Sequence, residues 1–223
     1  MSLLKNILQK IYPYGIFVLP SPLPLGGGMG EAAKTVYLTF DDGPIPEVTP
    51  KVLEILDRYH VKATFFMVGE NIDKHPEVFA QVVKAGHAIG NHTYNHLKGW
   101  KVGKQEYLAN VQKWEEAAQR NMPQGYPAPE PLRFRPPYGK ATLSQRRALH
   151  GMGYRIIYWD ILTRDYDATR TPEQMLAQIK RETRPGSIIN FHDSLKSNER
   201  MLAVLPLVIE WLKAKGYGLK VIG

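Results

Sequence analysis

Short runs of β-branched and aromatic residues alternate along the chain with longer segments in which apolar positions recur every three or four residues. Seven runs predict strands, and they cover residues 36–40, 63–68, 87–90, 132–135, 154–159, 187–191 and 217–221. The segments between them predict helices, including one that begins at Thr49-Pro50 and one that begins at Pro76. Strands that alternate with helices in this way favour a parallel sheet with right-handed crossovers.

The remaining connections and the N-terminal segment break this pattern. Residues 91–103 and the proline-rich stretch 121–131 are expected to be loops. Residues 1–10 resemble the first turns of an amphipathic helix, and residues 11–25 are apolar but contain four prolines, so we expect no transmembrane span. We interpret 1–30 as an N-terminal extension packed on a domain formed by 31–223, with an uncleaved export signal as the alternative. A cytoplasmic location is favoured, and the cell envelope stays open.

Composition narrows the classes of protein and of chemistry. A chain of 223 residues, 43% hydrophobic and 22% charged, fits one soluble domain better than two. The formal charge of +8 suits nucleic acid or an anionic polymer, but the basic residues are scattered and no nucleic-acid motif is present, so no specific nucleic-acid partner is expected. There are no cysteines, which excludes thiolate nucleophiles and Cys-ligated zinc. Any metal must therefore be held by His, Asp or Glu.

The first predicted strand ends at two adjacent carboxylates, Asp41 and Asp42, followed by Gly43-Pro44. In parallel α/β sheets the carboxyl ends of the strands are where ligands bind. Successive side chains leave an extended backbone in different directions, so one carboxylate can bind a metal while its neighbour stays free as a base. The alternative is a simple turn, which Asp and Gly also favour.

Two histidines, His92 and His96, follow the third predicted strand at a spacing of four residues. Such a pair can be presented to one metal ion, although it is often only a solvated helix face. One Asp and two His would give three protein ligands and leave a position for water, as in catalytic zinc sites.

Three more clusters follow strands. Paired prolines after Arg135 hold the chain extended and fix the direction of this side chain and of the Tyr138 amide, which suits an oxyanion donor; a plain connector is the alternative. The segment 158–166 runs from a strand into acids, and the strand at 187–191 is followed by His192, which on its own could be a hydrogen-bonded core residue.

Five clusters in this order resemble the polysaccharide deacetylases of carbohydrate esterase family 4, from about Thr35 to the C-terminus. Residues 39–44 (Thr-Phe-Asp-Asp-Gly-Pro) match the first family motif and residues 92–96 (His-Thr-Tyr-Asn-His) the second. We expect a distorted (β/α)7 barrel, with parallel strands wrapped by helices and the site at the carboxyl ends of the strands. The catalytic domain would then be 31–223.

The resemblance also implies roles for individual residues. Asp42, His92 and His96 would hold a divalent metal, usually zinc and alternatively Co²⁺, and Asp41 would be the general base.

Four further residues complete the implied machinery. Arg135 would orient the base, and the Tyr138 amide would help to stabilise the oxyanion. Asp165 would pair with His192, which would protonate the departing sugar amine.

Two positions depart from the family pattern. Tyr166 stands where the family usually has Trp, and Asn190 where it has Leu. With Pro137 they are expected to line the pocket for the acyl group, and a phenol and an amide would make that pocket more polar. The aromatic residues Tyr94, Trp100 and Tyr138 either stack on sugar faces or are ordinary packing.

The first hypothesis is a metal-dependent hydrolase that removes N-acetyl groups from amino sugars of a chitin-like or peptidoglycan-like glycan. A second is a hydrolase of non-sugar amides or cyclic ureides on the same scaffold. A third is a catalytically silent carbohydrate-binding protein, against which the presence of Asp41 and His192 argues. Nucleic-acid binding through the positive charge is the fourth. The oligomeric state is left open.

Overall fold

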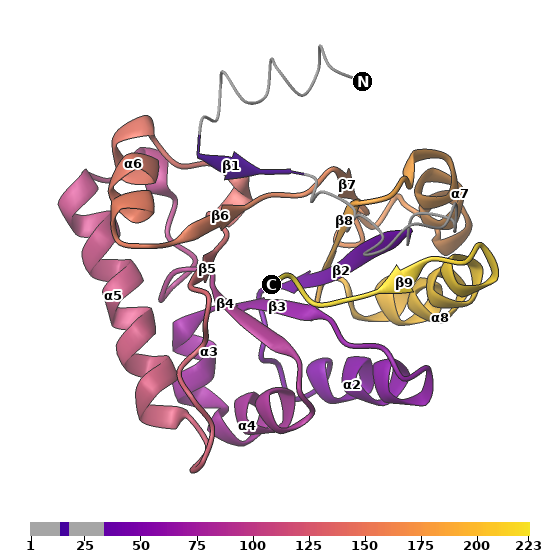
Figure 1. Cartoon of the computed structure of the whole chain (residues 1–223), viewed down its shortest axis with the longest axis horizontal. Helices are drawn as coiled ribbons and strands as arrows, with labels where there is room; N and C mark the ends of the chain where they lie inside the picture. The colour runs from indigo at the N-terminus through magenta and orange to yellow at the C-terminus, as the bar shows by residue number, and fades with distance from the viewer. Residues whose placement is uncertain (1–13, 18–33) are drawn as a thin grey trace, which may run out of the picture.

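A computed structural model describes residues 14–17 and 34–223, and its centre is a curled parallel sheet (Figure 1). The strands are β1 (Gly15–Ile16), β2 (Thr35–Asp41), β3 (Thr64–Met67), β4 (Ala88–Asn91), β5 (Arg133–Phe134), β6 (Arg155–Ile157), β7 (Ile161–Leu162), β8 (Ile188–His192) and β9 (Gly218–Leu219). Their order is β1-β6-β5-β4-β3-β2-β8-β7, and β9 pairs with the start of β2.

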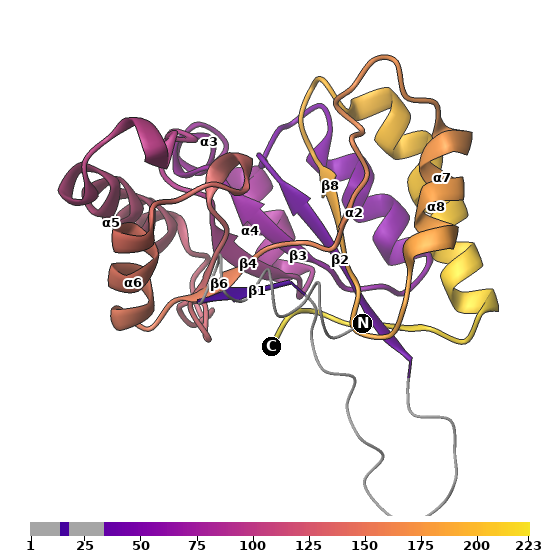
Figure 2. The same cartoon turned by 90° about the horizontal axis from the view of Figure 1, so that it is seen from above.

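The helices lie on the outer face of this sheet, with α5 and α6 at one end and α7 and α8 at the other (Figure 2). They are α2 (Thr49–Arg58), α3 (Gly69–Lys74), α4 (Pro76–Lys84), α5 (Lys104–Asn121), α6 (Leu143–Gly151), α7 (Pro172–Glu182) and α8 (Asn198–Ala214), with 3-10 turns η1 (Gly99–Lys101) and η2 (Pro137–Gly139). Capping boxes begin α6 at Thr142 and α7 at Thr171, where each hydroxyl accepts a hydrogen bond from the amide three residues on.

The expected barrel of parallel strands wrapped by helices is confirmed as a curled half-barrel. Consecutive strands β6 and β7 lie far apart in the sheet order, and the chain crosses between them over three residues. In this crossing Tyr158 N donates to Ile16 O on β1, and Asp160 N donates to Ile188 O on β8. The predicted strand at 154–159 is therefore shortened to β6, and the chain then crosses to β7 in another part of the sheet. Helix α3 was not predicted.

Strand β2 has all seven residues buried and separates two apolar environments. Val36, Leu38 and Phe40 belong to the main core against the helices. Tyr37 belongs to a smaller cluster inside the curl, with Ile188 and other residues. The alternation of a strand therefore places Thr39 and Asp41 on the inner side, above an apolar floor.

Only residues 14–17 of the N-terminal extension are described. There Gly15 pairs with Ile156 of β6, so this part of the extension forms an edge strand of the domain. The helix expected at 1–10 lies outside the described residues, and the division at 30/31 stays a prediction. Among the helices formed by 34–223, none is long and apolar enough to cross a membrane.

Candidate active site

Asp42 turns the chain away from strand β2 and directs its carboxylate toward two histidines. Its φ is 87°, a left-handed conformation that is uncommon for a residue other than glycine. Asp42 Oδ1 lies 3.4 Å from His96 Nε2 and 3.8 Å from His92 Nε2. The three side chains form a group that can hold a metal ion. The structure thus brings together the three ligands expected from the sequence.

The protonation state of the two histidines suits a metal. His92 Nδ1 donates to Arg135 O at 2.7 Å, which leaves the lone pair of Nε2 on the Asp42 side. Burial lowers the pKa of His92, and burial together with the neighbouring His92 lowers the pKa of His96 to about 4. Both rings are then neutral at pH 7, the form that binds metal ions. One Asp and two His are ligands that zinc accepts in a catalytic site with an open position.

Asp41 is only 2% exposed and lies in a closed network of hydrogen bonds. Arg135 Nη1 donates to its Oδ1 at 2.7 Å, and Asn190 Nδ2 donates to its Oδ2 at 3.0 Å. Burial alone would raise the pKa of Asp41, but the Arg135 guanidinium and the nearby imidazoles lower it overall. Asp41 is therefore an ionised carboxylate at neutral pH.

Arg135 is fully buried and held from several directions. Its Nε donates to Ile157 O at 3.2 Å and its Nη2 to Tyr158 O at 2.9 Å. The guanidinium also lies 4.1 Å from the centre of the Phe66 ring. These contacts fix the cation before any substrate binds, so it can orient Asp41 without rearranging.

His192 and Asp165 form a second carboxylate–imidazole pair. Asp165 Oδ1 accepts from His192 Nδ1 at 2.8 Å, and its Oδ2 accepts from the His192 amide at 2.7 Å. Burial alone would lower the pKa of His192, but the adjacent Asp165 raises it to about 9. The imidazole is therefore protonated at neutral pH and available as a proton donor.

The sequence that carries these residues matches a known protein family. The family model described as polysaccharide deacetylase matches residues 29–157, which include Asp41 and the three candidate metal ligands. The chain belongs to the polysaccharide deacetylase family.

Individual relatives of this chain support its assignment to the deacetylase family. A peptidoglycan-N-acetylglucosamine deacetylase of Bacillus cereus is 36% identical over 182 residues, which are 81% of this chain and 64% of that protein. A chitooligosaccharide deacetylase of Azorhizobium caulinodans is 32% identical over 209 residues, 86% of this chain and 97% of that protein. The chain thus spans less than two thirds of the first relative and nearly all of the second.

Solved structures share the fold. The Bc1960 peptidoglycan N-acetylglucosamine deacetylase has a TM-score of 0.84 at 32% identity, with 96% of this chain and 94% of that chain covered. A carbohydrate esterase family 4 pseudoenzyme from Bacillus anthracis has a TM-score of 0.79 at 25% identity, with 94% and 68% covered.

In this polysaccharide deacetylase chain, left-handed backbone conformations concentrate around the candidate site. Six non-glycine residues of the described chain have positive φ, and five of them follow strand ends on this face: Asp42, Thr93, His96, Tyr138 and Arg164. Such conformations are unfavourable and persist where the surroundings hold them, often at functional sites. Unfavourable backbone conformations therefore mark the site in addition to its side-chain motifs.

An aromatic rim adjoins the candidate metal ligands. The Tyr138 ring lies 4.6 Å from the His96 ring and 5.4 Å from that of Trp100, measured between centroids. Tyr138 is 50% exposed and Trp100 is 42% exposed, so both can meet a ligand. Tyr94 is partly buried and donates to Asp73, which indicates a packing role.

The three residues expected in the acyl pocket occupy different surroundings. Tyr166 is exposed and its ring lies edge-on to His192, with 5.0 Å between centroids. Pro137 and Asn190 are buried. The Asn190 amide faces Asp41 and Arg135, so this side chain lies beneath Asp41 instead of on the expected pocket surface.

Asp193 was missed by sequence reasoning. It is 1% exposed, accepts from Gly43 N at 3.0 Å and from Thr49 Oγ1 at 2.6 Å, and burial raises its pKa to about 8. It therefore ties the turn after Asp42 to the start of α2. Its position directly after His192 at a strand end was the available signal.

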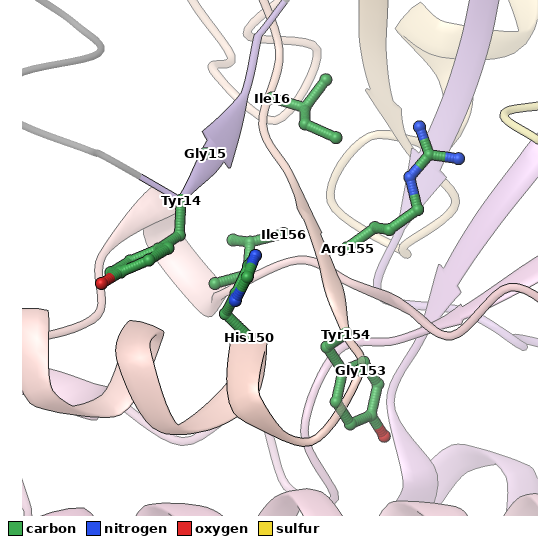
Figure 3. A pocket seen from close by; sticks show the side chains of 8 residues that line it. All are labelled: Tyr14, Gly15, Ile16, His150, Gly153, Tyr154, Arg155 and Ile156. Carbon is green, nitrogen blue, oxygen red and sulfur yellow. The ribbon is translucent and has the colours of Figure 1, made fainter.

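A hollow of about 440 Å³ lies elsewhere, between β1, β6 and α6 (Figure 3). Tyr14, His150 and Arg155 are among the residues that line it. It shares no residue with the clusters above, so the chemistry identifies the candidate site independently of this hollow.

Proposed function

We propose that this chain removes N-acetyl groups from the amino sugars of an oligo- or polysaccharide, peptidoglycan-like or chitin-like, by hydrolysis of the amide bond. The observation that carries the proposal is the pair Asp41 and Asp42, one enclosed as an ionised base and the other facing two neutral histidines. The names of the relatives support the substrate class, because they act on peptidoglycan N-acetylglucosamine or on chitooligosaccharides.

Asp42, His92 and His96 would hold the metal ion, zinc or another divalent ion such as Co²⁺. When bound, such an ion polarises a carbonyl oxygen and lowers the pKa of a water molecule. These three side chains fit a metal ion because His92 uses Nδ1 for its hydrogen bond to Arg135 O. Its other ring nitrogen, Nε2, faces the Asp42 carboxylate at 3.8 Å.

Asp41 would accept a proton from the water whose oxygen attacks the acetamide carbonyl carbon. Its low pKa keeps it ionised at neutral pH, and Arg135 holds its orientation. The Tyr138 amide, in the turn that Pro136 and Pro137 stiffen, is the proposed backbone donor to the oxyanion that forms.

His192 would donate a proton to the sugar nitrogen as the bond between carbon and nitrogen breaks. Asp165 keeps the imidazole protonated and fixes its Nδ1–H, so the proton that leaves is the one on Nε2. The products are acetate and a free amino sugar. A silent carbohydrate-binding protein would have no use for this poised acid and base, which argues against that alternative.

The test is acetate release from N-acetylglucosamine oligomers and from peptidoglycan by the zinc-loaded protein. Release from either substrate, abolished by chelation and by Asp41→Asn, supports the proposal. Protein that binds zinc but releases no acetate from either substrate contradicts it, and the second hypothesis, hydrolysis of non-sugar amides, is then tested with the same protein.

A further inference from the structure

Asn190 lies in the layer directly beneath the reactive residues. In the β2–β8 register, Tyr37 pairs with Ile188, Thr39 with Asn190, and Asp41 with His192. Since alternate residues of a strand share one face, these pairs form three steps from an apolar floor to the reactive level. Asn190 is in the middle step and is fully buried, so it has no surface to offer a substrate.

The contacts of Asn190 define its orientation. Its Oδ1 accepts from Arg135 Nη1 at 2.6 Å and from Thr39 Oγ1 at 2.9 Å, while its Nδ2 donates to Asp41 Oδ2 at 3.0 Å. Turning the amide over would place its NH₂ against two donors and its oxygen against a carboxylate. The network therefore permits only one orientation.

Both oxygens of Asp41 are held as a result. Arg135 bonds Oδ1 and Asn190 bonds Oδ2, so the plane of the carboxylate is fixed at two points. With Arg135 alone, the carboxylate could rotate about its Cβ–Cγ bond, a torsion with broad minima. A leucine at this position would fill the space without forming either contact.

We propose that Asn190 is a positioning residue: it acts through Asp41 and Arg135 to fix the direction in which the base accepts its proton, and it does not contact the substrate. This inference rests on the proposed function of Asp41. It replaces the expectation that Asn190 makes the acyl pocket polar.

The direct test is Asn190→Leu, with steady-state kinetics, zinc content and thermal unfolding measured on the same preparation. We expect kcat to fall by about tenfold to 10²-fold, because a small displacement of a catalytic group has effects of this size. KM should change less than about twofold, since no substrate contact is removed. Zinc content should equal that of the wild type, because Asn190 forms no hydrogen bond with Asp42, His92 or His96.

Thr64→Val is the matched control. Thr64 is equally buried, and its hydroxyl accepts a hydrogen bond from Ile222 N at 3.0 Å, at the start of β3 and away from the reactive level. This variant should lose stability and keep its kcat. It separates a general loss of buried hydrogen bonding from a loss of base orientation.

A second variant covers the case in which Asn190→Leu does not fold. Asn190→Asp keeps the shape and the acceptor toward Arg135 but sets a carboxylate against Asp41, so it too should lower kcat and leave KM nearly unchanged. Unchanged kcat in a folded variant overturns the inference, as does a raised KM with unchanged kcat, which would mean a substrate contact. Failure of the wild type to release acetate would instead overturn the proposed function, before any Asn190 variant is made.

Discussion

Two neighbouring carboxylates, Asp41 and Asp42, occupy opposite environments. Asp41 is the last residue of β2, is 2% exposed, and has both oxygens in hydrogen bonds to buried donors. Asp42 has a side chain 29% exposed and faces His92 and His96 across a gap of 3.4 to 3.8 Å. One carboxylate is enclosed by the protein and the other is left open to a ligand.

The difference arises from the backbone. Asp41 follows the alternation of the strand and points into the curl of the sheet, whereas a φ of 87° at Asp42 turns the next side chain out of that alternation. Two identical side chains at consecutive positions therefore reach a buried hydrogen-bond network and a candidate metal cluster. Their separation is what the following predictions test.

The largest effect is expected at the candidate metal ligands Asp42, His92 and His96. His92→Ala removes one of three candidate metal ligands, so the bound zinc should be lost and acetate release should fall to that of the chelated wild type. Zinc content by elemental analysis and activity are measured together. His150→Ala, an exposed histidine of α6, is the control and should retain both. Full zinc occupancy in His92→Ala would contradict the assignment.

A smaller loss is expected when His192, the proposed proton donor, is altered. His192→Ala should lower kcat by roughly 10²–10⁴-fold, the usual contribution of general acid catalysis. In the wild type the proposed donor is the protonated His192 ring, so kcat should fall as the pH rises through the His192 pKa of about 9.

Asp165→Asn tests whether Asp165 sets the pH at which kcat falls. The Asp165 carboxylate raises the pKa of His192, so its removal should move the alkaline fall in kcat to lower pH. The measurement is a kcat profile from pH 6 to pH 10 in about 0.5-unit steps. An alkaline limb that stays in place would show that another group donates the proton.

On the closed side, Arg135→Met should destabilise the fold by about 3–5 kcal/mol at pH 7, because it leaves Asp41 buried without its cation. Asp41 has a lowered pKa in the folded state, so this stabilisation is present above the unfolded pKa of about 3.9 and is lost as the pH falls through the folded value. Urea unfolding at pH 7 and at pH 3 measures the difference between wild type and variant. A difference that does not shrink at low pH would argue against the ion pair.

The smallest effect is expected at the rim. Trp100→Ala removes an exposed ring in contact with Tyr138, and we expect KM to rise roughly three- to tenfold, equivalent to about 0.7–1.4 kcal/mol. The value of kcat and the zinc content should not change. An unaltered KM would assign Trp100 to packing.

Sequence patterns predicted the regular parts of this fold well. The buried run 36–40 is within β2, and the helices expected to begin at Thr49 and at Pro76 are α2 and α4. Two features escaped because they depend on distant residues. The strand in the run 154–159 ends at Ile157, because Tyr158 N bonds to β1 and Asp160 N to β8 as the chain crosses the sheet. Helix α3 is too short to show an apolar periodicity.

The sequence predicted which residue types form the candidate site, but not how these residues are layered above and beneath Asp41. The sequence placed Asn190 in the acyl pocket, whereas it lies beneath Asp41, because its position depends on the register between β2 and β8, whose paired residues Thr39 and Asn190 are 151 apart in sequence. The role of Asp193 depends in the same way on Gly43 and Thr49. Strand-end motifs identify the chemistry, and pairing register assigns the position of each group.

The most direct measurement is the zinc content of Asp41→Asn beside that of Asp42→Asn, with acetate release from the same samples. The separation of the two carboxylates predicts that Asp41→Asn binds zinc as the wild type does but releases no acetate, while Asp42→Asn loses the zinc itself. Equal loss of zinc in both variants would contradict the separation and would mean that the two carboxylates serve one metal site together.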